Sequence, residues 1–423
     1  MTSTDASTTA RHARAHPHGR AQCYVQPIGL VAVEEAAAAA PQDPLRLAGG
    51  PLAFTAIRTM MRAADGNVTA RVEPASAPAN DAPETGPGSQ SEAALLLAAL
   101  RPRAPIAGLA MDQPHIMGIV NVTPDSFSDG GRLTTHEAAV AHALRLADEG
   151  AAILDIGGES TRPGAEPVSI DEELQRTIPV IEALASRTPA RLSIDTRNAP
   201  VMRAALAAGA HIINDVSALT HDPEGLATAA ALACPVVLMH AQGTPQTMQA
   251  DPRYQDVLLD VFDALSARLT ACVEAGIARE AIVVDPGIGF GKTTAHNLTL
   301  LRGLSLFHTL GVPILVGASR KGFIGQVSGV ARADQRLAGS LAAALQAVSQ
   351  GAQILRVHDV AQTRQALSVW RAIGDGVAGE RLAARRKFGV WVPLQRKGEP
   401  ALDNAALQAA AECCARAIRV NHG

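Results

Sequence analysis

The sequence predicts an α/β fold, a (β/α)₈ TIM barrel, for residues 113–374. Three observations support this prediction. Short apolar runs alternate with stretches of helical periodicity, which is typical of a parallel sheet flanked by helices. The alternation covers about 260 residues, close to the roughly 250 that such barrels take. Nearly every apolar run ends in polar or charged residues, which would meet on one face of a barrel.

Each apolar run is short and stops at a turn signal or a polar group, as buried strands do. In chain order the runs are HIMGIVNV, AILDIGGES, RLSIDT, HIINDV, PVVLMH, AIVVDPG, PILVGASRK and QILRVHD. The stretches between them, such as HEAAVAHALRLADEG, are rich in Ala and Leu at helical spacing. An open, doubly wound sheet is the alternative, but in that fold only the strands at the switch point would face a ligand.

The remaining residues are predicted to be additions to the barrel. Residues 1–22 are expected to be a disordered tail, because they lack an apolar face. Residues 23–112 form an N-terminal extension with a flexible linker near 71–92, where Pro, Ser, Gly and acidic residues dominate. Within it, YVQPIGLVAV is expected to be a strand and GPLAFTAIRTMMRAADG a helix, both packed on the barrel. Residues 375–423 form a C-terminal tail with one helix.

The composition excludes several classes of function. The net charge of −3 gives no sign of a basic surface for nucleic acid. With 3% aromatic residues, few side chains are available to stack on nucleic-acid bases. No apolar run approaches the roughly 18 residues that span a membrane. The five cysteines lack metal-ligand spacing, so we expect reduced thiols in a cytoplasmic protein, including the adjacent pair Cys413 and Cys414.

The stretch DPGIGFGKTTAHN, from Asp285 to Asn297, has the look of a phosphate-binding loop. The P-loop pattern, however, needs a glycine where Pro286 stands, and the glycine spacing also differs from the dinucleotide fingerprint. We therefore predict that the glycines make a tight turn after Asp285. Lys292 is then expected to be a surface residue without a phosphate role.

Seven side chains at the ends of the runs form the candidate site. They are Asn121, Asp195, Asn214, Asp285, Lys321, Arg356 and His358. The acids and amides among them suit a flat heterocycle with N–H edges, and the cations suit an anion. Asn121 is a neutral oxygen ligand of the kind that Mg²⁺ accepts. No cysteine and no histidine pair has the spacing of a zinc site.

Some of these residues also have a purely structural interpretation. Asp195 precedes a helix and could cap it, and Asn214 could satisfy the backbone of its own loop. A structural hydrogen bond is the favoured interpretation of His240. Arg356 and His358 alternate along a strand, and two basic groups at one strand end favour a functional interpretation, because Arg is rarely buried unpaired.

From Pro114 to about Arg371 the sequence resembles the pterin-binding enzyme family. The resemblance is carried, in order, by MGIVNVTPDSFSDGG, DIGGESTRPG, SIDT, HIINDVSAL, VLMHAQGTPQTMQ, DPGIGFGK, LVGASRKGFIG and LRVHDV. It implies a transferase of folate biosynthesis that joins 4-aminobenzoate to 6-hydroxymethyl-7,8-dihydropterin diphosphate and releases diphosphate. The resemblance also implies Mg²⁺ as cofactor and small molecules as partners. A homodimer is left open.

The resemblance further implies roles for the site residues. Asn121 would hold Mg²⁺, and Arg356 and His358 would stabilise the departing diphosphate. Four side chains at the ends of four predicted strands would hold the pterin ring: Asp195, Asn214, Asp285 and Lys321. Ser319 would line the aminobenzoate pocket together with Lys321.

The resemblance also points to two loops. Thr161 and Arg162 lie on GESTRPG, which together with TPDSFSDGG is expected to close over the substrates. Two alternatives remain. One is a methyltetrahydrofolate-binding domain of the corrinoid methyltransferases, and the other is a non-catalytic pterin-binding protein. Neither needs the cationic SRKG and RVHDV motifs.

Overall fold

The computed structural model describes residues 22–33, 35–36, 45–76, 91–122, 135–159, 168–243 and 247–374. The first compact unit ends at Ser368. Of the second unit, which begins at Val369, the structure describes only the end of one helix, to Gly374.

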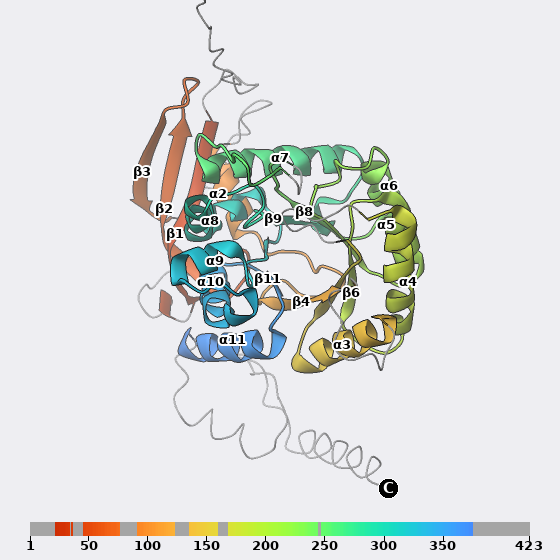
Figure 1. Cartoon of the computed structure of the whole chain (residues 1–423). Coiled ribbons are helices and arrows are strands. Elements are labelled where there is room, and N and C mark those ends of the chain that lie inside the picture. Colours follow the sequence, from red (N-terminus) through yellow and green to blue (C-terminus); the bar gives the residue numbers. More distant parts are fainter. Residues whose placement is uncertain are drawn as a thin grey trace, which may run out of the picture. The chain divides into compact units, whose positions relative to one another are not determined.

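A parallel eight-stranded sheet with the order β10-β11-β4-β5-β6-β7-β8-β9 forms a barrel, with helices outside it (Figure 1). A parallel bridge between Val284 and Ile314 joins the last strand of this order to the chain entering the first, so the open-sheet alternative is excluded. The strands are β4 (His115–Asn121), β5 (Ile153–Gly157), β6 (Arg191–Asp195), β7 (Ile212–Asp215), β8 (Val236–Met239), β9 (Ile282–Asp285), β10 (Leu315–Val316) and β11 (Ile354–Val357). The predicted barrel is thus confirmed, strand by strand.

Helices follow the strands in the expected alternation. They are α3 (Thr135–Glu149), α4 (Ile170–Ala185), α5 (Ala199–Ala207), α6 (Gly225–Leu232), α7 (Val257–Glu274), α8 (Thr294–Arg302), α9 (Gly322–Ser328), α10 (Leu337–Ser349) and α11 (Val360–Gly374), with short 3₁₀ helices η2 (Arg279–Ala281), η3 (Leu304–Leu310) and η4 (Ala333–Gln335). None of the described helices is long and apolar enough to cross a membrane.

The interior of the barrel is apolar toward the end where the strands begin. One buried cluster combines a side chain from most strands with two residues of the segment that precedes β4: Met117, Ile153, Ile212, Val237, Val283, Leu315 and Ile354, with Ile106 and Met111. Packed layers of branched side chains are typical of such barrels. The polar residues are therefore left to the opposite end, where the strands finish.

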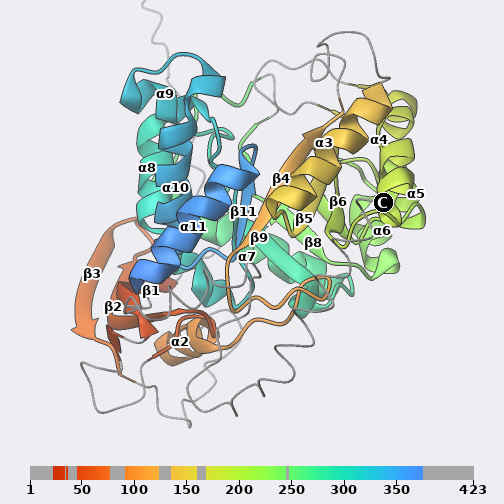
Figure 2. The ribbon, with the colours of Figure 1, turned by 90° about the horizontal axis from the view of Figure 1, so that it is seen from below.

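The N-terminal extension contains a three-stranded antiparallel sheet of β1 (Gln22–Ala32), β2 (Leu52–Arg62) and β3 (Val68–Pro74), followed by α2 (Glu92–Leu100). In both views the sheet lies on the side of the barrel away from α4 and α5 (Figure 2). The helix predicted for GPLAFTAIRTMMRAADG was wrong, because these residues form β2. Its Ala, Met and Arg residues favour helix locally, but β2 pairs with β1 from Leu52–Ala32 to Arg62–Gln22. The first residues of the linker expected near 71–92 belong to β3, and residues 77–90 lie outside the described part.

The sheet is held to α7 and η3 by buried polar contacts. Tyr24 Oη donates to Asp263 Oδ2 at 2.9 Å, and Arg62 forms ion pairs with Asp260 at 2.8 Å and Asp263 at 3.1 Å. Gln26 Nε2 donates to Ser305 Oγ at 3.2 Å. The extension therefore packs on the barrel through specific contacts. Its boundaries at residues 23 and 112 remain a prediction.

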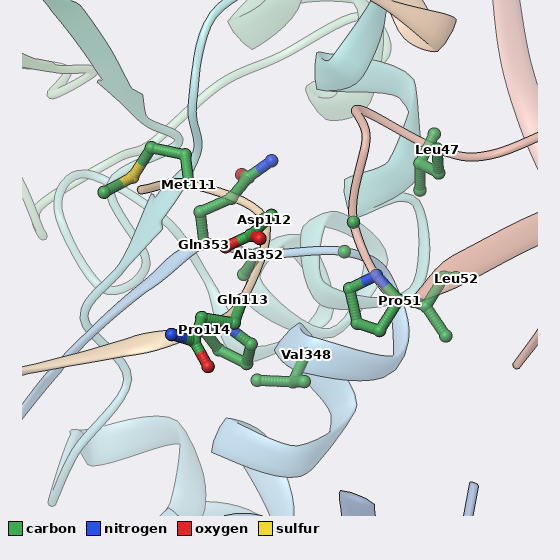
Figure 3. Close-up of a pocket in the computed structure, with 12 residues that line it drawn as sticks. Leu47, Pro51, Leu52, Met111, Asp112, Gln113, Pro114, Val348, Ala352 and Gln353 are labelled. Carbon is green, nitrogen blue, oxygen red and sulfur yellow. The ribbon is translucent and has the colours of Figure 1, made fainter. Parts of the chain in front are cut away.

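A small pocket lies where the extension meets the starting ends of β4 and β11 (Figure 3). Leu47, Pro51 and Leu52 face the segment from Met111 to Pro114 and the turn before β11. Its volume of about 20 Å³ has room for about one water molecule. It lies at the end of the barrel opposite the candidate site and is too small for a substrate.

The Arg62 contacts give a first prediction. The Arg62 side chain is 3% exposed, so the substitution Arg62→Ala should lower the free energy of unfolding by about 1–3 kcal/mol, because two aspartates lose charged hydrogen bonds. The control is Arg71→Ala, because Arg71 is 53% exposed in its pairs with Glu73 and Glu92, and exposed ion pairs contribute little to stability. Urea unfolding measures both variants. Equal losses would mean that the sheet is not anchored through Arg62.

Candidate active site

The centre of the site is one guanidinium group shared by two carboxylates. From β11, Arg356 donates through Nε to Asp155 Oδ2 at 2.6 Å and through Nη2 to Asp195 Oδ2 at 2.7 Å. The three residues come from β11, β5 and β6, and in the sheet order β4 lies between β11 and β5. The Arg356 side chain is only 22% exposed, and its two charged acceptors agree with the expectation that Arg is rarely buried unpaired.

Asp155 connects this pair to the neighbouring strands. Its side chain is fully buried, and it accepts from Ser193 Oγ at 2.6 Å and from Asn214 Nδ2 at 3.0 Å. Our sequence analysis did not select Asp155. The signal was present, because an acid in the middle of the apolar run AILDIG must find partners if the run is buried.

Neither of the structural roles considered for Asp195 and Asn214 is seen in the structure. Helix α5 is preceded by Asn198 as its N-cap, while the Asp195 carboxylate accepts from Arg356 instead of capping the helix. Asn214 donates to Asp155 and not to its own loop. Burial raises the pKa of Asp195 to about 7, and Arg356 acts in the opposite direction. Burial would lower the pKa of Arg356, but the carboxylates of Asp155 and Asp195 raise it above its usual value.

Asp285 ends β9 and begins the glycine-rich turn. Its Oδ1 accepts from the backbone N–H of Gly287 at 2.7 Å. Burial raises the pKa of Asp285, whereas the Gly287 N–H and Lys321 lower it. Gly287 has φ +69°, and a Cβ there would lie 1.9 Å from the carbonyl oxygen of His240. The tight turn is as predicted, and glycine is required because the turn packs directly on the loop after β8.

Lys321 lies over this turn. Its Nζ donates to the carbonyl of Ile288 and lies 4.1 Å from the centroid of the Phe290 ring. Burial lowers the pKa of Lys321 to about 7, while Asp285 raises it. The preceding residue, Arg320, has φ +58° and forms an ion pair with Asp359. A non-glycine residue in this backbone conformation is unfavourable in free energy, so the surrounding contacts must fix the shape of the loop.

His358 and Ser319 form a second contact between the ends of β10 and β11. The backbone N–H of His358 donates to Ser319 Oγ at 3.3 Å, and ring Nδ1 lies 3.0 Å from the same oxygen. His358 and Arg356 therefore have different partners, although both come from β11 or the residue after it. Together with Lys321 they gather three basic side chains at one end of the barrel.

Of the remaining predicted residues, only Asn121 lies in the described part of the chain. Asn121 is the last residue of β4 and is half-buried, paired in register with Gly157. Thr161 and Arg162, and with them the loop of Phe127, lie outside the described residues. In the part of the chain that the structure describes, no three His, Cys, Asp or Glu side chains gather as a metal cluster would require.

The expectation that Lys292 is a surface residue was wrong. Lys292 is 3% exposed, and its Nζ lies 2.9 Å from His240 Nδ1, 3.2 Å from the His240 carbonyl oxygen and 3.0 Å from that of Phe290. The glycine-rich turn folds the chain back, so that Lys292 enters the interior. The favoured interpretation of His240 as a partner in a hydrogen bond agrees with this geometry.

A cavity of about 370 Å³ opens beside these residues, within the roughly 300–1,000 Å³ of small-molecule sites. Val216, Met239, His240 and Phe290 line it, together with Arg197 and residues of α7. The wall is therefore built mainly from the chain that follows β6, β7, β8 and β9. Asp285 and Lys321 do not line it, but Asp285 pairs with Met239 and Lys321 lies over the ring of Phe290.

Comparison with known proteins identifies the family. Residues 117–358 match the family model described as pterin binding enzyme. Dihydropteroate synthase of Escherichia coli K12 is 50% identical over 264 residues, which is 62% of this chain and 93% of that protein.

Solved structures agree with the family match. Dihydropteroate synthase of Xanthomonas albilineans with 4-aminobenzoic acid is 55% identical, has a TM-score of 0.61, and covers 64% of this chain and 97% of its own. The Burkholderia cenocepacia synthase complexed with 7,8-dihydropteroate is 45% identical, has a TM-score of 0.58, and covers 67% and 99%. The chain therefore belongs to the pterin-binding enzyme family, as a transferase of the dihydropteroate synthase group.

Proposed function

We propose that the chain condenses 6-hydroxymethyl-7,8-dihydropterin diphosphate with 4-aminobenzoate to give 7,8-dihydropteroate and diphosphate. The observation that carries this proposal is the division of the site. Carboxylates and an amide on β6, β7 and β9 lie beside basic groups on β11 and in the residues that follow β10 and β11. Such a site suits a substrate with an N–H-rich ring at one end and an anion at the other. The ligands named for the related structures, 4-aminobenzoic acid and 7,8-dihydropteroate, support the same reaction.

The acidic half would bind the pterin ring. Asp195 and Asp285 offer carboxylate oxygens to ring N–H groups, and Asn214 offers an amide oxygen while its nitrogen is held by Asp155. Lys321 would donate to the carbonyl edge of the ring. Because these groups are buried and already hydrogen-bonded, little reorganisation is needed when the ring enters.

The basic half would act on the diphosphate. Arg356 uses Nε and Nη2 for the two aspartates, and its Nη1 has no hydrogen-bond partner among the described residues and is not sealed in the interior. Nη1 can therefore donate to the leaving group. His358, anchored through Ser319, adds a second donor. Ser319 and Lys321 also border the place proposed for 4-aminobenzoate.

The chemistry follows from the leaving group. Diphosphate departs from a carbon attached to an electron-rich pterin ring, and the ring stabilises the cation that remains. Asp195 and Asp285 stabilise this cation, and the basic half stabilises the developing anion. The arylamine nitrogen then forms the C–N bond and loses a proton. Loops containing Phe127, Thr161 and Arg162, which lie outside the described residues, are proposed to exclude water at this stage.

We include Mg²⁺ in the proposal. Mg²⁺ commonly takes one or two protein oxygens together with substrate phosphates and several waters, and the single amide oxygen of Asn121 fits such an ion. Asn121 would hold it, and the bound ion would supply positive charge at the diphosphate. A cytoplasmic location and a homodimer remain expectations from the sequence.

The reaction gives a direct prediction. The purified full chain, supplied with both substrates and Mg²⁺, should release diphosphate and form 7,8-dihydropteroate in equal amounts, and a chelator should abolish both signals. Chromatography measures the pterin product, and a coupled assay measures diphosphate. Pterin binding without product, with or without Mg²⁺, would favour the non-catalytic alternative instead.

Substitution of His358 by alanine should lower kcat by about 10²–10³, because one preorganised donor to the leaving group is lost. The affinity for the pterin ring should change little. The matched control is His211→Ala, because His211 precedes β7 at the opposite end of the barrel, where its Nδ1 accepts only from the Leu192 N–H. If turnover of His358→Ala equals that of His211→Ala, His358 has no part in the reaction.

A further inference from the structure

Lysine is rare in this chain, and its few positions are informative. Of the 37 Lys and Arg residues, only Lys292, Lys321, Lys387 and Lys397 are lysines. The described part contains the first two, and both lie in the active site. Elsewhere the chain uses Arg for positive charge. An ammonium group differs from a guanidinium in being compact and in being able to lose its proton. These properties direct attention to Lys292, which the proposed reaction does not use.

Lys292 has three acceptors for its three N–H groups. They are His240 Nδ1, the His240 carbonyl and the Phe290 carbonyl. The first two lie after β8 and the third in the turn after β9, so Lys292 ties together the two loops that line the cavity. Other charged or titratable groups face it from the surrounding elements: Asp285 at the end of β9, Lys321 after β10 and His296 in α8. Tyr254, whose ring lies near both histidines, donates to the carbonyl of Gly291.

The second ring nitrogen of His240 is available to a ligand. Among the described residues, His240 Nε2 has no hydrogen-bond partner and is not sealed in the interior. His240 itself lines the cavity between Met239 and Phe290. In a neutral imidazole one ring nitrogen is a hydrogen-bond donor and the other is an acceptor. A partner that fixes the role of one nitrogen therefore also fixes the role of the other.

We propose that Lys292 is a positioning residue for the proposed reaction: through its hydrogen bond to His240 Nδ1, it decides whether His240 offers an N–H or a lone pair to the substrate cavity. His240 is then a substrate-binding residue, and Lys292 acts through it. This inference rests on the proposed function only for the identity of the ligand.

Both protonation states of Lys292 satisfy the same three partners. As an ammonium, Nζ donates to Nδ1 and to both carbonyls, so the proton of the neutral ring is on Nε2. As an amine, Nζ donates to the two carbonyls and accepts from an Nδ1–H, so Nε2 has a lone pair. Passing from the first state to the second moves one proton from Nζ to Nδ1, while Nε2 releases one proton to ligand or solvent. One proton is lost overall.

The electrostatic environment allows this exchange near neutral pH. Burial lowers the pKa of Lys292 to about 7, with Asp285 acting against the shift and Lys321 adding to it. Burial, with Lys292 beside it, lowers the pKa of His240 to about 3, so the imidazole ring stays neutral in both states. His240 should therefore act as a donor at acidic pH and as an acceptor at alkaline pH.

The tautomer can be observed without any assay of activity. We would label histidine with ¹⁵N in the full chain and assign His240 by the loss of its signals in His240→Asn. Below pH 7 the expected spectrum has a protonated Nε2 and a bare Nδ1, and the two should exchange character as pH rises through about 7. A protonated Nδ1 at pH 6, an imidazolium, or a tautomer that does not change with pH would overturn the proposal. Because the titration is read on the wild-type chain, and a variant is used only to assign the His240 signals, absence of synthase activity does not affect the result.

A double-mutant cycle separates this role from simple support of the loops. Lys292→Met should lower kcat/KM by about tenfold, the value of one hydrogen bond of about 1.4 kcal/mol. The variant His240→Asn keeps an acceptor near Lys292 but removes the cavity nitrogen. In the His240→Asn background, Lys292→Met should lower kcat/KM further by less than about twofold, because the effects of coupled residues are not additive. Lys292→Arg should not rescue activity, because guanidinium retains its protons.

A purely structural Lys292 would give a different cycle. Its bonds to the two carbonyls remain in His240→Asn, so Lys292→Met would then cause the same loss in both backgrounds, and rescue by Lys292→Arg would indicate that only positive charge matters. Either result would contradict the proposal. If Lys292→Met does not fold, as judged by circular dichroism, the wild-type ¹⁵N titration alone decides.

Discussion

The site depends on the guanidinium of Arg356 and the two buried carboxylates that share it. Asp155 is fully buried in the middle of the apolar strand β5, and an isolated charge in that place would cost several kcal/mol. Arg356, Ser193 and Asn214 satisfy its oxygens. The network joins β5, β6, β7 and β11, so the positions of Asp195, Asn214 and Arg356 depend on partners from other strands. The network lies on the apolar cluster that fills the barrel interior.

A second consequence is a near balance of buried charge. Asp195 and Asp285 are opposed by Arg356, Lys321 and Lys292 in a space with little water, where small changes of environment move protons. The pKa values of Asp195, Lys321 and Lys292 accordingly all lie at about 7. Such a site can stabilise a cation on the pterin ring and an anion on the diphosphate without a strong nucleophile, because its dipoles and charges are already oriented.

Much of this arrangement could be predicted from the sequence, because parallel strands are short apolar runs and their final residues converge. Asp155 could have been found from an acid inside such a run. Lys292 could not, because its burial depends on carbonyl groups of a loop fifty residues away in sequence. Strand β2 was missed for a similar reason: its residues favour helix locally, and only pairing with β1 and β3 makes them a strand.

The central claim is that Asp155, which cannot touch a ligand, sets the geometry of the residues that do. The most direct test is calorimetric titration of the pterin diphosphate into the wild-type chain and into Asp155→Asn, with the fold checked by circular dichroism. Loss of the charge opposite Arg356 should weaken binding at least about tenfold, the equivalent of about 1.4 kcal/mol. Equal affinity in a natively folded variant would contradict the claim that the shared guanidinium organises the site.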